Sequence, residues 1–164
     1  MIEENKNFWE NCGHTYEEHV DVDNQDLKNR VMFGTYESGR FDGQGISICS
    51  RFSSEKIAKM AIERALEIRC SEIEEWMKLG YQEEIVVTVN FSKAIGVGYV
   101  KGTNLRKDPY LMYSICVVLR ADAHFRSYSI VTAYPTPNRN VGKQIAKDKK
   151  DFYEERRARR TQRQ

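Results

Sequence analysis

Two histidines in the motif GHTYEEHV, His14 and His19, are residues whose type and spacing could do chemistry. An imidazole titrates near neutral pH, so it can accept or release a proton during catalysis. If residues 13–20 form one regular helix, the five-residue offset turns the two side chains about 140° apart around its axis. We therefore expect one histidine to act and the other to pack or support it. The alternative for each is a structural imidazole.

A pair of hydroxyl groups ends the strand-like run RSYSIVTAY at 126–134. Its period-two alternation predicts one sheet face that carries Tyr128, Ile130, Thr132 and Tyr134. Thr132 and Tyr134 would then form a polar pair at the end of a strand. The alternative is that both hydroxyls only cap the sheet edge. Their combination with a helical histidine and with Arg30 favours a functional site, because a guanidinium suits charged phosphate oxygens.

Helices are expected to position the histidines. The segment 13–20 has the pattern of a short helix, and Asp23 or Asn24 can cap a second one. A longer helix is predicted from an N-cap at Ser53 or Ser54 to about Leu79, because its apolar residues recur with a 3.6-residue period. The glycine-rich segment 34–45 between these helices is predicted to be a loop.

Extended segments follow the helices and are expected to carry the hydroxyl pair. Residues 83–91 and 95–100 are predicted to form a hairpin, and 112–120 and 126–134 a second antiparallel pair, with a loop at 101–110. Pro135 and Pro137 are expected to end the sheet, because proline cannot donate to a strand ladder. Helices first and antiparallel strands second predict an α+β fold.

The chain has 164 residues, 40% of them hydrophobic, and a net charge of +2, as expected for one globular domain. No stretch approaches the roughly 18 apolar residues that a membrane helix requires. The four cysteines lack the spacing of a zinc site, and Cys70 and Cys116 are expected to be buried free thiols. No nucleotide or other cofactor motif is present.

Charge is distributed unevenly along the chain. Residues 1–28 contain eight acidic and two basic residues, whereas residues 139–164 contain ten basic and four acidic ones. A basic terminal segment can hold a polyanion by releasing counterions, although many such segments are simply solvated. We expect three parts: a lead-in at 1–11, a domain at 12–137 and a basic tail at 138–164 that is either helical or disordered.

The motifs together resemble a known family. GHTYEEHV, Arg30 eleven residues after His19, RFSSEKIAKMAIERALEIRCSEIEEWM, VVLR and VTAYPT occur in the order found in the bacterial ribonuclease A-like toxin domain. Such domains occupy the carboxyl ends of contact-dependent growth inhibition proteins and other polymorphic toxins. The resemblance runs from about Cys12 to Pro137. It implies a ribonuclease A-like α+β fold with a curved antiparallel sheet.

The resemblance also implies an activity and a site. The activity is cleavage of RNA without a metal ion or cofactor, by a secreted or cell-surface-delivered toxin that acts in the cytoplasm of a target cell. The implied partners are RNA and a cognate immunity protein, and the domain is expected to be a monomer that does not insert into membranes. The family's site residues correspond to His19, Arg30, Thr132 and Tyr134, with His14 as a second candidate.

Two points stay open at this stage. Asp21 stands where the family often has glycine and would raise the pKa of a nearby imidazole by favouring its charged form. Cleavage through the 2′-hydroxyl needs a second proton-transfer group, for which Tyr134 and His14 are candidates, unless Arg30 makes it unnecessary. His124 is expected in an exposed turn. A non-catalytic module that binds RNA or protein through the basic tail is the alternative function.

Overall fold

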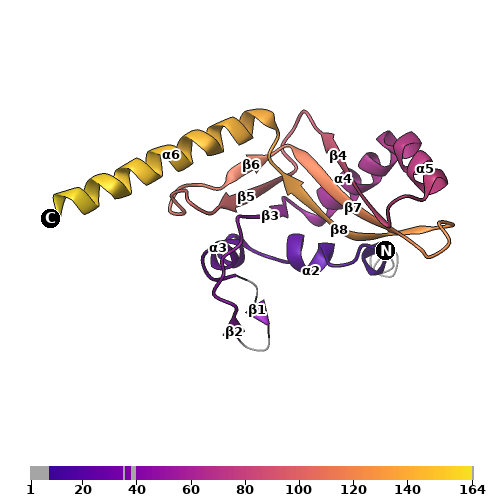
Figure 1. The fold of residues 1–164 in the computed structure, drawn as a ribbon, viewed down its shortest axis with the longest axis horizontal. Coiled ribbons are helices and arrows are strands. Elements are labelled where there is room, and N and C mark those ends of the chain that lie inside the picture. Colours follow the sequence, from indigo (N-terminus) through magenta and orange to yellow (C-terminus); the bar gives the residue numbers. More distant parts are fainter. Residues whose placement is uncertain (1–7, 35, 38–39, 164) are drawn as a thin grey trace.

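The computed structural model describes residues 8–34, 36–37 and 40–163 and contains both helices and antiparallel strands. Their order differs from the predicted one of helices first and strands second, because three short strands between residues 36 and 52 precede the helices at 55–79 and a helix at 139–162 follows the last strand. The predicted α+β class is confirmed (Figure 1). Residues 1–7 of the predicted lead-in lie outside the described residues. Phe8 and Trp9, at the end of that segment, pack against the core, and the Trp9 indole donates a hydrogen bond to Glu55.

Side-chain caps mark the start of three of the described helices. Helix α2 (Thr15–His19) is one turn long, and α3 (Asn24–Phe33) starts at a capping box between Asp23 and Asp26. The Ser54 hydroxyl caps α4 (Glu55–Ile68), and Asn138 caps α6 (Arg139–Gln162). The starts of α3 and α4 agree with the sequence prediction, and the tail, which the sequence left as helical or disordered, is a helix.

The long helix predicted to reach Leu79 is instead two helices, α4 and α5 (Cys70–Leu79). The break lies at Arg69, which ends the first helix and begins the second. Its guanidinium donates two hydrogen bonds to the Thr88 carbonyl, at 3.1 and 3.0 Å. The local sequence has no proline or glycine at this point, so the feature that accompanies the break is this contact with a distant strand. Cys70, expected to be buried, is exposed just beyond it.

Two three-stranded antiparallel sheets form the other half of the fold. One has the order β3 (Ile48–Phe52), β5 (Gly96–Val100), β6 (Tyr110–Met112), and the other β4 (Glu84–Asn90), β7 (Ser114–Ala121), β8 (Tyr128–Thr136). The predicted pairing of 112–120 with 126–134 is confirmed. The predicted hairpin of 83–91 with 95–100 is wrong, because β4 pairs with β7 while β5 pairs with β3 and β6.

Two smaller predictions about the strands are also corrected. The predicted loop at 34–45 contains two-residue strands, β1 (Tyr36–Glu37) and β2 (Arg40–Phe41), that pair with each other. Pro135 does not end the sheet, because β8 continues to Thr136 and Pro135 lies opposite Ile115. β8 is an edge strand of its sheet, where a missing N–H donor is tolerated.

A β-bulge changes the faces of β8. Ile130 lies opposite Leu119 and Thr132 opposite Val118, so Val131 is an extra residue without a partner on β7. Ile130 and Ala133 therefore both belong to the buried core. The predicted face shared by Ile130 and Thr132 is wrong, because simple alternation ignores the inserted residue. Thr132 and Tyr134 still share a face, since they lie beyond the bulge.

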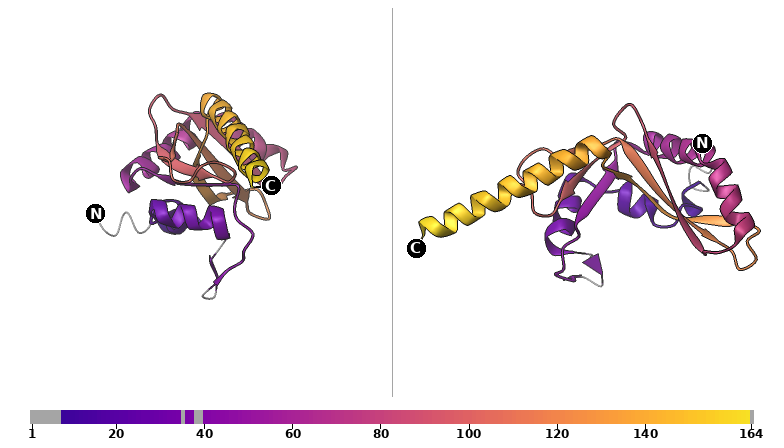
Figure 2. Two further views of the ribbon diagram at one scale, coloured as in Figure 1. Left: turned by 90° about the vertical axis from the view of Figure 1, so that its left-hand side faces the viewer. Right: turned by 45° about the horizontal axis from the view of Figure 1, so that its top comes forward.

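The main core lies between α4, α5 and the sheet of β4, β7 and β8. It includes Ala61, Ile62, Val117 and Leu119, which are fully buried, and Trp76, as predicted from its helical stripe. Helix α2 lies along the other side of β8, and α6 projects from the body of the molecule (Figures 1 and 2). No helix in the described part of the chain is both long enough and apolar enough to cross a membrane.

Candidate functional site

Gly13 lets the chain entering α2 approach β8 closely. Its φ is +58°, and a Cβ atom added there would lie 1.9 Å from the Val131 carbonyl oxygen. The next backbone N–H, that of His14, donates a hydrogen bond to the same oxygen at 3.2 Å. Val131 is the bulge residue, so its carbonyl is available to α2 rather than to β7. The glycine and the bulge together seat α2 on β8.

The Thr15 hydroxyl makes a second link between α2 and β8. Its Oγ1 donates to the Cys12 carbonyl at 2.6 Å and accepts the Ala133 N–H at 2.9 Å. The side chain is fully buried, so both polar partners would lack water if it were removed. Thr15 therefore fixes the short helix, and with it His19 at the helix end, relative to the strand that carries Thr132 and Tyr134.

The imidazole of His19 is oriented by β3. Its Nδ1 lies 2.8 Å from the Ser50 carbonyl oxygen. A carbonyl only accepts, so Nδ1 carries the proton and Nε2 is the nitrogen that titrates. The Ser50 hydroxyl donates to the Pro135 carbonyl at 2.6 Å, which ties β3 to β8 at the same level. Ser50 thus joins the histidine to the strand of the hydroxyl pair.

Burial lowers the pKa of His19 below its ordinary value. The Ser50 carbonyl and the Glu18 carboxylate oppose this shift, and the positive charge of Arg30 adds to it. The Glu18 carboxylate lies 3.7 Å from Nε2, and the His19 side chain keeps 15% of its surface exposed. The acidic neighbour is thus Glu18 rather than the expected Asp21, and the net shift is downward because desolvation disfavours the imidazolium.

The Tyr134 ring packs beside His19. The two ring centroids are 5.4 Å apart. Burial, together with a hydrogen bond to the Cys116 side chain, raises the pKa of Tyr134 to about 12. Cys116 is the residue directly opposite Tyr134 on β7. The phenol therefore keeps its proton throughout the neutral range.

The Thr132 hydroxyl is buried without a hydrogen-bond partner in the part of the chain that the structure describes. Among the described residues, its Oγ1 is the one buried side-chain oxygen or nitrogen that has no hydrogen-bond partner. A buried hydroxyl without a partner is costly and uncommon. Thr132 lies two residues before Tyr134 on the same face of β8, so its unpaired hydroxyl lies beside the phenol.

Arg30 reaches the same place from α3. Its Nη1 donates to the Glu18 carbonyl at 2.7 Å, and its charge acts on His19 and Cys49. The guanidinium is half-buried and retains further N–H donors in a planar fork. His19 and Tyr134 are thus in ring contact, the charge of Arg30 acts on His19 from the neighbouring Glu18 carbonyl, and Thr132 lies two residues before Tyr134 on the same strand.

The other two histidines lie apart from this group. His14 is exposed at the start of α2, and no hydrogen bond, ion pair or ring contact joins its side chain to another described residue. His124 lies in the exposed turn between β7 and β8, as predicted. In the described part of the chain, no three His, Cys, Asp or Glu side chains gather in a way that could hold a metal ion.

Sequence reasoning missed several residues that build the site. Ser50 acts on His19 through its carbonyl, which no residue type reveals, and Cys116 depends on the register of β7 against β8. Thr15 was part of the histidine motif but was not singled out. The glycine that begins that motif was the available signal, because a glycine beside buried polar residues often marks a close backbone approach.

Comparison with known proteins places this geometry in a family. A family model described as the bacterial CdiA-CT RNase A domain matches residues 13–135. The chain belongs to this family. The matched segment of the CdiA-CT RNase A domain begins at Gly13 and ends at Pro135, so it contains all five candidate residues, whereas α6 lies beyond it. The predicted resemblance is confirmed, and with it a ribonuclease toxin domain.

A solved structure has the same fold. It is described as the crystal structure of a CdiA-CT/CdiI complex from Y. kristensenii, and it matches with a TM-score of 0.62 at 20% sequence identity. The match covers 76% of this chain and 100% of the other. At this identity the likeness concerns the CdiA-CT fold. A comparison with curated proteins gave no match.

Proposed function

We propose that this CdiA-CT RNase A domain cleaves RNA without a metal ion, by attack of a ribose 2′-hydroxyl on the neighbouring phosphate. One observation carries the proposal: the His19 imidazole is tied through Nδ1 to Ser50 and lies 5.4 Å from the Tyr134 ring, centroid to centroid. RNA supplies its own nucleophile, so the enzyme needs only to move protons and stabilise charge. The proposed site contains groups for both tasks.

His19 is the proposed general base. Its Nε2 takes the proton of the 2′-hydroxyl, whose oxygen then forms a bond to phosphorus. The lowered pKa leaves this nitrogen unprotonated at neutral pH, as a base requires. The fixed Nδ1–H bond to Ser50 keeps the ring in place while Nε2 changes its protonation state.

Arg30 and Tyr134 complete the proposed reaction. The Arg30 guanidinium stabilises the negative charge that grows on the phosphorane oxygens. As the bond from phosphorus to the 5′-oxygen breaks, Tyr134 gives its proton to that oxygen, and the products are a 2′,3′-cyclic phosphate and a 5′-hydroxyl. The phenol is protonated at neutral pH because its pKa is about 12. The hydrogen bond from Tyr134 to Cys116 is weak because sulfur is a poor acceptor, so a bond to the leaving oxygen can replace it.

Thr132 is the proposed contact to the base of the substrate. Its buried Oγ1 can both donate and accept, and it lacks a partner among the described residues. Hydrogen bonds to base edges are a common means by which proteins recognise single-stranded RNA. His14 takes no part in the proposed reaction, because its exposed side chain contacts none of the other candidates.

We extend the proposal to the biological setting. The neighbouring CdiA-CT structure is a complex with CdiI, which supports a cognate immunity protein as the partner that neutralises this monomeric domain in its producer. Membership of the CdiA-CT family supports delivery from the surface of one bacterium to another. RNA in the cytoplasm of the recipient cell is the proposed target.

A digestion of RNA by the purified protein in EDTA tests the function and the site together. The native protein should produce 2′,3′-cyclic phosphate ends, and His19→Ala should lose about 10²- to 10⁴-fold in rate, the usual contribution of a general base. His14→Ala is the matched control and should stay close to the native rate. Dependence on a metal ion, or an undiminished rate in His19→Ala, would contradict the proposal.

The exposed, basic α6 favours a second candidate function, binding of RNA without turnover. This function would also account for a site with one histidine at its centre. The two candidates differ in a simple way: a salt-sensitive RNA complex that yields no products over a long incubation would favour the binding module.

A further inference from the structure

A groove separate from the proposed active site lies between α3, the loop at 101–106 and α6. Its volume is about 610 Å³. The apolar residues that line it include Met32, Leu105 and Phe152, and the charged ones are Lys101, Arg106, Glu155, Arg156 and Arg159. The groove thus combines an apolar floor with four cationic side chains and one anionic one.

The four cations of this groove are free to bind a ligand. Lys101, Arg106, Arg156 and Arg159 are all exposed, and none forms an ion pair with another residue in the described ranges. Arg156 lies over the Phe152 ring, 5.4 Å from its centroid. Four cations beside a single carboxylate, that of Glu155, leave an excess of like charge that repels, and an anionic ligand would relieve this cost.

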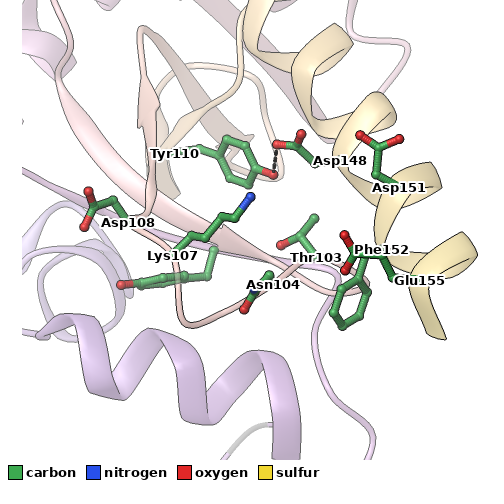
Figure 3. A pocket seen from close by; sticks show the side chains of 10 residues that line it. Thr103, Asn104, Lys107, Asp108, Tyr110, Asp148, Asp151, Phe152 and Glu155 are labelled. Atoms are coloured by element: carbon green, nitrogen blue, oxygen red, sulfur yellow. Dashed lines mark hydrogen bonds between the residues drawn. The ribbon is translucent and has the colours of Figure 1, made fainter. Parts of the chain in front are cut away.

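Helix α6 is anchored so that its arginines overhang the groove. Ile145 is buried, Phe152 is half-buried, and the Tyr110 hydroxyl donates to Asp148 at 2.6 Å (Figure 3). With 3.6 residues per turn, Arg156 and Arg159 continue the stripe of Ile145 and Phe152. The second half of α6 projects from the domain (Figure 2), and there the face that holds the first half on the domain carries arginines.

Helix α3 contributes residues to both the groove and the proposed active site. Arg30 belongs to that site, and the two residues that follow it, Val31 and Met32, line the groove. A strand of RNA whose phosphate lies at Arg30 would have to pass around α3 to reach Lys101 and Arg106. The groove also lies partly outside the family match, because Arg156 and Arg159 belong to α6.

We propose that this groove binds the phosphates of single-stranded RNA that flank the cleaved bond, and so makes the enzyme favour long RNA over dinucleotides. The inference rests on the proposed ribonuclease function and specifies its substrate class. Charge complementarity argues for the RNA backbone, since guanidinium and ammonium groups bind phosphate and apolar or aromatic side chains pack against bases.

The salt dependence of binding tests this proposal without relying on cleavage. The probe is a fluorescent single strand of about 12 nucleotides made with 2′-deoxyribose, which lacks the nucleophile. The test variant is K101Q/R106Q/R156Q/R159Q. The control is K56Q/R64Q/K78Q/R126Q, which makes the same change in net charge at four exposed residues away from the groove. Circular dichroism checks that both variants are folded.

Loss of four phosphate contacts should reduce the slope of log Kd against log salt by about 3. Between 50 and 200 mM salt, the Kd of the test variant should therefore rise about 50-fold less than the Kd of the native protein. The control variant should keep the native slope. Parallel assays should show a raised KM for the RNA 12-mer in the test variant and an unchanged rate on a dinucleotide.

Each outcome has a distinct meaning. Equal salt slopes and equal Kd values for native protein and test variant would overturn the inference and leave this face for a protein partner. Equal loss in both variants would also overturn it, because net charge alone would explain the binding. Failure of the native protein to cleave either substrate would reject the ribonuclease proposal, while the deoxy probe would still decide whether the groove binds the strand.

Discussion

Two regions of the molecule are held by different kinds of contact: the junction formed by α2, β3 and β8, and the helix α6. At the junction, Thr15 bonds to a residue 118 positions away and Ser50 to one 85 positions away. In α6, Gln144 bonds to Asp148 and Thr161 to Arg157, each four residues apart. The proposed chemistry thus depends on long-range contacts between buried groups. In α6 the Tyr110–Asp148 bond and the buried Ile145 hold the first half on the domain, whereas the second half, which carries Arg156 and Arg159, is exposed.

This difference makes the junction sensitive to single atoms. A buried hydrogen bond that loses one partner costs the desolvation energy of the other, whereas an exposed one is replaced by water. The same substitution made in the two regions should therefore have very different effects, and such pairs measure the comparison directly.

Glycine to alanine gives the largest expected contrast. Gly13→Ala places a Cβ atom 1.9 Å from the Val131 carbonyl at a φ of +58°. It should lower the free energy of unfolding by about 3–5 kcal/mol and the cleavage rate by about 100-fold or more, because α2 and His19 must move. Chemical denaturation and dinucleotide cleavage measure the two effects.

Gly142→Ala in α6 is the matched control for that substitution. A Cβ atom at Gly142 meets no atom within 4 Å. Alanine in this helix should raise the free energy of unfolding by about 0.5–1 kcal/mol, since it loses less backbone entropy than glycine. Equal effects of the two substitutions would contradict the distinction between the regions.

Threonine to valine gives the next contrast. Thr15→Val removes the hydroxyl that accepts the Ala133 N–H and should cost about 1–3 kcal/mol in a urea titration, because that N–H stays buried. Thr161→Val removes an exposed bond to the Arg157 carbonyl and should change stability by less than about 0.5 kcal/mol. A cost at Thr161 as large as that at Thr15 would show that burial does not control these bonds.

The pH dependence of kcat/KM examines the electrostatics of the junction. Because a base works only when deprotonated, the rate should rise about tenfold per pH unit below the pKa of His19, which lies below its usual 6.5. It should then stay level through the alkaline range, since Tyr134 keeps its proton up to about 12. Glu18→Gln should move the rise to lower pH by removing a charge that favours the imidazolium. A fall in rate just above neutral pH would indicate an imidazole acid instead.

The smallest expected effect belongs to the end of α6. Residues 157–163 are exposed, so deleting 157–164 should change the free energy of unfolding by less than about 0.5 kcal/mol. Urea denaturation measures this. A loss above about 1 kcal/mol would show that the end of α6 contributes to the stability of the core.

Locally encoded features of the fold were predictable from sequence. The caps at Asp23 and Ser54, the buried stripe with Trp76, the antiparallel pair of β7 and β8 and the α+β class all follow from short-range patterns. The partner of β4 was not predictable, because strand patterns do not specify which strand pairs with which. Nor was the break at Arg69, which depends on a carbonyl of β4.

The candidate site shows the same limit. His19, Arg30, Thr132 and Tyr134 could be proposed from motif order, and contacts bring His19, Arg30 and Tyr134 together. Their catalytic roles stay predictions. The bulge at Val131 and the carbonyl of Ser50 could not be foreseen, because one is an irregularity of register and the other is a backbone group common to all residue types.

Nitrogen NMR of the His19 imidazole tests the central claim most directly. The native protein should show Nδ1 protonated in the neutral ring and Nε2 titrating with a pKa below 6.5, as burial and the Ser50 carbonyl require. A 2′-deoxydinucleotide should shift the Nε2 resonance, because its phosphate would lie beside that atom. An imidazole with its proton on Nε2 at neutral pH, or one unaffected by the dinucleotide, would contradict the proposed site.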